Sequence, residues 1–107
     1  MGSRFSSDQL MWIREQATIY QCACPAQVSS LLSEILQVYK YQADCLNQTD
    51  TDIVVHETIA KATAAAYSIM ETCLADVLTQ EGWDMQTLTM PNTLKKRMLD
   101  AIESGRN

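Results

Sequence analysis

Four cysteines carry the most distinctive chemistry in this 107-residue sequence. Cys22 and Cys24 are separated by one residue, and Cys73 lies far along the chain. If the two long helices expected between these positions form a plain antiparallel hairpin centred near Gln48, Cys73 comes level with the other two. The spacing therefore predicts three thiols at one end of the molecule, with Cys45 alone at the other end.

Three such thiols have two interpretations. Thiolates in this number suit a trigonal Cu(I) site or, with a fourth ligand, a zinc site, and two of them could form a reversible disulfide. Free cysteine is also among the most buried residue types, so Cys73 could pack a core while Cys22 and Cys24 pack a turn. A metal-binding or redox protein that uses Cys22, Cys24 and Cys73 is therefore one functional hypothesis.

The common catalytic patterns do not occur. There is no Ser-His-Asp order, glycine-rich phosphate loop or Glu-x-x-His motif. His56 is the single histidine, and no carboxylate or thiol follows it at three or four residues, so capping or packing is its expected role. We expect no catalytic residues and no enzymatic activity.

The elements that must position these residues are helical. Three glycines and two prolines are too few for the turns of an all-β chain, and apolar residues recur with a helical period. The pattern predicts an all-α, four-helix up-and-down antiparallel bundle with helices near 7–21, 25–46, 52–81 and 91–104. One domain should cover residues 1–107, with 1–6 and 105–107 flexible.

Local signals set the predicted boundaries. Ser6 and Gln9 form a capping box, and Thr49 begins a run of possible N-caps for the central helix. Pro25 is expected to exclude Cys24 from a helix and to open the second one. Gly82 is the expected stop, with an irregular stretch or a single turn after it.

The central helix is the longest, at about 45 Å, and carries a regular apolar stripe. The stripe consists of Val55, Ile59, Ala62, Ala66, Ile69, Cys73 and Val77. Its spacing predicts the core-facing side of the helix. A run of small residues beside it has two explanations: the high helix propensity of alanine, or a helix–helix contact between subunits. The residues assigned to this homodimer interface are Ala60, Ala64, Ala65 and Tyr67.

Charge gives weaker information. The formal net charge of −5 argues against a nucleic-acid partner. Lys95, Lys96 and Arg97 form a basic cluster that a solvated helix face explains. No membrane span or secretion signal is recognisable, so a cytoplasmic protein is expected. The sequence thus favours a small cytoplasmic interaction protein, homodimeric, with a further protein partner that it does not identify.

Overall fold

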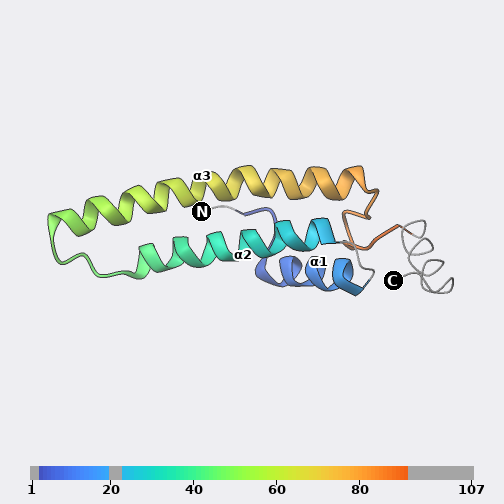
Figure 1. The fold of residues 1–107 in the computed structure, drawn as a ribbon, viewed down its shortest axis with the longest axis horizontal. Helices are drawn as coiled ribbons and strands as arrows, with labels where there is room; N and C mark the ends of the chain where they lie inside the picture. Colours follow the sequence, from blue (N-terminus) through green and yellow to red (C-terminus); the bar gives the residue numbers. More distant parts are fainter. Residues whose placement is uncertain (1–2, 20–22, 92–107) are drawn as a thin grey trace.

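The computed structural model describes residues 3–19 and 23–91, and within them the chain is all-α (Figure 1). It forms helices α1 (Ser7–Ile19), α2 (Ala23–Asp44) and α3 (Asp50–Gln80). The one β-type pairing in this part of the chain is an isolated bridge between Asp84 and Thr89. The all-α prediction is confirmed. The four-helix bundle is corrected to three helices packed against one another, and the predicted helix 91–104 lies outside the described residues beyond Pro91.

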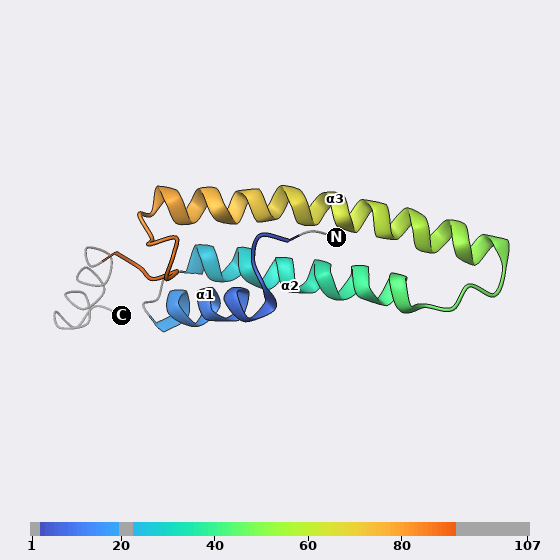
Figure 2. The same ribbon diagram turned by 180° about the vertical axis from the view of Figure 1, so that it is seen from behind.

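The helices form an open layer. α2 lies in the middle and packs against both α1 and α3, whereas α1 does not pack on α3 (Figures 1 and 2). α1 lies beside α2 as far as Lys40, which borders a groove with α1, and does not extend along the whole of α3. The radius of gyration is 17.6 Å, compared with about 13 Å for a compact domain of this length. Two helices that project beyond the third explain this elongation.

The predicted helix caps are present. At the start of α1, Gln9 donates its backbone N–H to Ser6 Oγ (3.1 Å), and Ser6 donates its own to Gln9 Oε1 (2.8 Å). At the start of α3, Asp52 donates to Thr49 Oγ1 (3.1 Å), and Thr49 donates back to Asp52 Oδ2 (3.2 Å). Each box satisfies amides that a helix leaves free at its first turn.

The start of α2 differs from the prediction. The helix begins at Ala23, so Cys24 is helical and Pro25 is the third helical residue. The prediction that Pro25 excludes Cys24 from the helix is therefore wrong. The first turn tolerates proline because the amides there have no acceptor within the helix.

The buried core lies at one end of the layer, which we call the closed end. α1 contributes Leu10, Ile13 and Ala17 to it, α2 contributes Leu32, and α3 contributes Leu74 and Leu78. The N-terminal arm, residues 3–6, adds Phe5, and residues 81–91 add Trp83, Leu88 and Met90. Most of the hydrophobic stabilisation of the chain must come from this end.

Residues 81–91 form a lid over the closed end. Gly82 adopts a φ of 79°, which stops α3 as predicted. Asp84 Oδ1 accepts the backbone N–H groups of Thr87 (3.0 Å) and Gln86 (2.9 Å), and these hydrogen bonds lower the pKa of that carboxyl. The Trp12 indole N–H donates to Leu88 O (2.9 Å) and ties the lid to α1.

The rest of the α2–α3 hairpin, which we call the open half, has no such core. Every residue from 33 to 66 is at least partly exposed. α1 reaches only the beginning of this half, where Ser33 to Lys40 border the groove beside it and Ile35 and Leu36 pack against the core. Two helices in contact with each other alone cannot cover all their apolar side chains.

Candidate interaction surface

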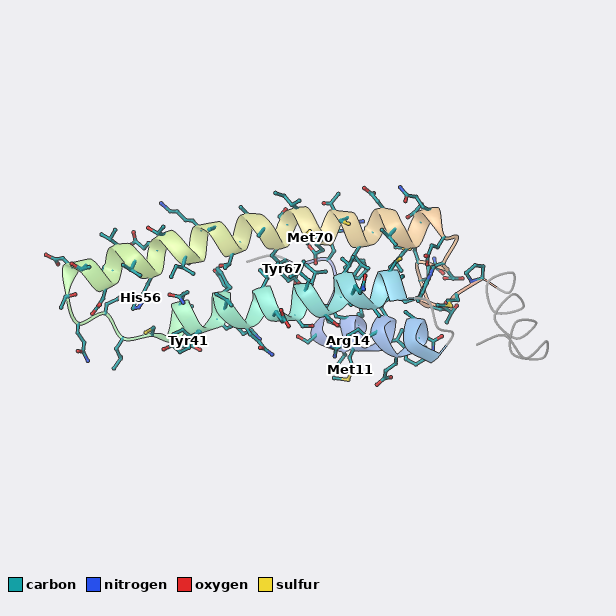
Figure 3. All side chains as sticks on the ribbon, in the orientation of Figure 1. Met11, Arg14, Tyr41, His56, Tyr67 and Met70 are labelled. Carbon is teal, nitrogen blue, oxygen red and sulfur yellow. The ribbon has the colours of Figure 1, made fainter. Side chains whose placement is uncertain are left out.

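The inward face of α3 is not the predicted stripe. The buried residues of α3 are Tyr67, Glu71, Leu74, Ala75 and Leu78. Half-buried His56, Ala60 and Thr63 continue this face into the open half. Figure 3 shows Tyr67 and His56 on the side of α3 that faces α2. Two polar side chains of this face are satisfied nearby: Thr63 donates to Ile59 O (2.8 Å), and His56 Nδ1 lies 2.6 Å from Asn47 Oδ1.

The predicted stripe lies roughly a third of a turn further round the helix. Ile69 is 69% exposed and Val55 46% exposed, and Ala62 is exposed as well. The prediction that the stripe faces the core of the chain is therefore wrong. The reason is that α3 packs on one helix only, so one face is covered and the neighbouring apolar face is not.

We call this face the uncovered row of α3. Its members from Val55 to Cys73 alternate between exposed residues (Val55, Ala62 and Ile69) and half-buried ones (Ile59, Ala66 and Cys73). Val77, the last residue of the predicted stripe, is half-buried beyond them. A matching row on α2 recurs at steps of three and four residues. Its members are Leu31, Ile35, Val38, Gln42 and Cys45. Leu31 and Val38 are exposed, and the other three are half-buried.

Both rows lie on the same side of the hairpin. α1 packs on the opposite flank of α2, where Ser33, Gln37 and Lys40 face it across a groove. The arm crosses the opposite flank of α3, where Glu71 accepts its backbone N–H groups. At about 100° per residue, Val38 and Ile69 point away from these flanks. Figure 2 shows the side that the arm crosses, and Figure 1 shows the side that the two rows share.

The shared side has the composition of an interface centre. Neither row contains a charged residue, although both helices carry several. Glu34 and Asp76 border the two rows, because Glu34 lies four residues before Val38 and Asp76 three after Cys73. Other sides of the two helices carry Lys40, Asp44, Glu57 and Lys61. Depletion of charge is the main compositional mark of the buried centre of an interface. Gln42 is the most polar member, and its Oε1 atom is buried without a hydrogen-bond partner in the described chain.

The interface residues predicted from sequence do not form one exposed patch. Tyr67 is 1% exposed and belongs to the core at the closed end. Ala60 and Ala64 are half-buried, and Ala65 is exposed on another flank from the uncovered row. Self-association through these four residues stays a prediction. The sequence signal that marks the uncovered row is its unbroken apolar period. The same signal is typical of a stripe that faces the core of the chain.

Beside Tyr67, a buried carboxylate holds the arm in place. Glu71 Oε2 accepts the backbone N–H groups of Arg4 and Phe5 (3.0 Å for the latter). Burial raises the pKa of the Tyr67 hydroxyl, the negative charge of Glu71 raises it further, and the Ser3 side chain acts in the opposite direction. The hydroxyl oxygen has no partner of hydrogen-bonding geometry in the described chain. This arrangement anchors the arm and offers no nucleophile.

The three described cysteines are free thiols at separate places. Cys24 is exposed in the first turn of α2, Cys45 is half-buried just beyond its last turn, and Cys73 is half-buried in the uncovered row. Residues 45–49 run on past the end of α2 (Figure 1), so residues equally distant from Gln48 are not level. Within the described residues no group of three or more His, Cys, Asp or Glu could hold a metal ion. Cys22 lies outside them, so a site that uses Cys22, Cys24 and Cys73 stays a prediction.

A groove of about 270 Å³ between α1 and α2 is the other feature that could receive a ligand. Arg14 and Lys40 line it together with Met11 and Leu36, and Figure 3 shows Arg14 and Met11 on α1. Its lining contains no paired nucleophile and base, so it supplies no catalytic group. The basic cluster Lys95, Lys96 and Arg97 lies outside the described residues.

No helix in the described part of the chain has the length and hydrophobicity that a bilayer crossing needs. Comparison of the chain with models of protein families, with curated proteins and with solved structures finds no match. The surfaces of the molecule are therefore the basis for inferring its function.

Proposed function

We propose that the chain is a non-catalytic, cytoplasmic helical protein that acts through protein–protein interaction, and that it is a homodimer in which a second copy covers the two uncovered rows. The observation that carries this is the uncovered row of α3, an uncharged helical stripe from Val55 to Cys73 on which Val55, Ala62 and Ile69 stay exposed within residues 3–19 and 23–91. A helix face that stays in water does not need apolar residues repeating at the helical period, so this repeat indicates a face that packs against a partner.

The size of the surface fits a dimer. Over the length of α2, about 33 Å, two helices each about 10 Å wide present on the order of 650 Å². A stable complex buries about 800 Å² on each partner. The full width of the shared side is therefore somewhat smaller than one partner's part of a standard interface, and of the same order.

A second copy fits this surface because the centre of the row is small. Ala62 and Ala66 let another helix approach α3 closely, at the lower end of the usual 8–10 Å between packed helix axes. The bulkier Ile59 and Ile69 flank them. Both copies carry a net charge of −5, so their repulsion should weaken, and their association strengthen, as salt is added.

A matched pair of variants tests the proposal. Ala62→Lys places a cation in the uncovered row, and Ala65→Lys places the same side chain on an exposed position of another flank. An unpaired charge in an interface costs several kcal/mol. Light scattering after size exclusion should give twice the 12.0 kDa chain mass for the native protein and for Ala65→Lys, and the monomer mass for Ala62→Lys. A native chain that is monomeric at micromolar concentration contradicts the proposal, as does dissociation by Ala65→Lys alone.

A further inference from the structure

The uncovered row of α3 is symmetrical about the level of Ala64. The pairs at equal distance from it are, going outward, Ala62 and Ala66, Ile59 and Ile69, and Val55 and Cys73. The inner pair is identical and small, the next pair is identical and large, and the outer pair is of similar size. From Val55 to Cys73 the row therefore reads nearly the same in both directions along the helix, whereas Val77, which continues the stripe, has Thr51 as its counterpart.

The row of α2 has a centre of its own. Leu31 and Cys45 each lie seven residues from Val38, and Ile35 and Gln42 lie three and four residues from it. Both ends of this row are thus equally far from Val38, which is exposed. A surface of two rows that each have a centre can match a reversed copy of itself.

We infer that the two copies pack with their α3 helices antiparallel, about a two-fold axis that passes at the level of Ala64 perpendicular to the helices; this inference rests on the proposed function. In a two-fold interface, residue i contacts residue j and j contacts i. Ala62 then meets Ala66 of the second copy, Ile59 meets Ile69, and Val55 meets Cys73. α2 stacks on α2 in the same way, and all neighbouring helices run antiparallel.

The arrangement has a consequence for the whole assembly. The four long helices form a closed bundle, which supplies the open half of each hairpin with the core that it lacks alone. The two closed ends then lie at opposite ends of the dimer, each with its own arm and its own groove beside Arg14. The assembly is a rod with two equivalent ends.

The native Cys73 provides the probe. It is a free thiol, and in the antiparallel arrangement it lies 18 residues along α3 from the Cys73 of the second copy, a distance of about 27 Å. Mild oxidation of the native chain should therefore form no Cys73–Cys73 disulfide. Val55→Cys should instead form a disulfide between position 55 of one copy and Cys73 of the other, because bridged residues need Cα atoms within about 7 Å.

The controls separate the alternatives. Val54→Cys is also exposed but lies on another flank, so it should give no linked dimer, and adding Cys73→Ala to Val55→Cys should abolish the link. Peptide mapping that finds links between identical positions, surviving Cys73→Ala, would show a parallel pairing and overturn the inference. No link from Val55→Cys in a protein that has dimer mass also overturns it, and leaves the proposed function standing. A monomer mass for the native chain removes the proposed function itself.

Discussion

The two ends of the α2–α3 hairpin are built differently. At the closed end, α1, the arm and the lid cover α2 and α3, and Leu32, Leu74 and Leu78 are fully buried. In the open half the same two helices continue without the arm or the lid, α1 extends only as far as Lys40, and every residue from 33 to 66 keeps some exposure. Each region has one helix that starts at a capping box, at Ser6 and at Thr49, and the two regions differ in packing.

This difference indicates which part of the chain can stand alone. Most helical stability in proteins comes from the packing of an apolar face. The closed end has such packing within one chain, and the open half does not. We therefore expect a gradient of local stability along α3, high near Leu74 and low near Val55. Packing of a second copy on α3 would raise the local stability near Val55 and reduce this gradient.

The largest expected effect separates the two faces of α3. Leu74→Ala removes a fully buried side chain and should lower the free energy of unfolding by about 2–5 kcal/mol. Ile69→Ala removes a similar side chain from the uncovered row, so it should cost the isolated chain less than about 1 kcal/mol but weaken the dimer. Urea denaturation of a monomeric background such as Ala62→Lys measures the first quantity. Equal losses from the two variants in that background would contradict the assignment of the faces.

Glu71 tests how the closed end holds the arm. Glu71→Ala leaves the backbone N–H groups of Arg4 and Phe5 without their acceptor, which should cost about 1–3 kcal/mol. Glu57→Ala, at an exposed position of the open half, is the matched control and should change stability by less than about 0.5 kcal/mol. Thermal unfolding followed by circular dichroism compares them. If Glu57→Ala costs as much as Glu71→Ala, the arm is not a stabilising element.

A smaller effect is expected from the cap of the open half. Thr49→Ala removes the acceptor for the Asp52 amide and should cost about 1 kcal/mol. Thr51→Ala, two residues on and without a capping hydrogen bond in this structure, should cost clearly less. Unfolding curves of the two variants give the difference. Identical curves would mean that the first turn of α3 contributes nothing to the folded state.

The smallest effect concerns pH. The pKa of Tyr67 is raised above the ordinary value of 10.0 because the hydroxyl is buried, so the folded state disfavours its ionised form. This contribution to stability is complete below about pH 10 and is lost as the pH rises through the folded-state pKa. Tyr67→Phe should be close to neutral at pH 7 and should flatten the loss of stability above pH 10. Parallel curves for both proteins up to pH 11 would contradict the burial of this hydroxyl.

Much of the fold was predictable from local chemistry. The capping boxes at Ser6 and Thr49 and the stop at Gly82 depend on neighbouring residues, so the sequence sufficed for them. The predicted start of α2 was wrong because proline is compatible both with a turn before a helix and with the first turn of the helix. The inner face of α3 was missed for a different reason. It includes Thr63, whose hydroxyl donates to Ile59 O one turn back in the same helix. It also includes Glu71, whose partners Arg4 and Phe5 only the folded chain reveals.

The uncovered row could be found from sequence but not assigned. Its period is the clearest in the chain, and a period shows that a face is buried without showing by what. α3 carries two such faces, and the one with fewer polar residues was assigned to the core of the chain. Which face is covered within the chain depends on where α1, the arm and the lid lie, and these contacts join residues far apart in the sequence.

Amide hydrogen exchange of the native protein and of Ala62→Lys is the most direct test of the central claim, that the open half depends on a second copy. The account predicts that residues 33–66 exchange at least about tenfold faster in Ala62→Lys, since protection there reflects a local opening free energy that the dimer raises. The closed end, around Leu74 and Leu78, should exchange at the same rate in both proteins. Unchanged protection of residues 33–66 in a variant that has monomer mass would contradict the account, because the open half would then be stable without a partner.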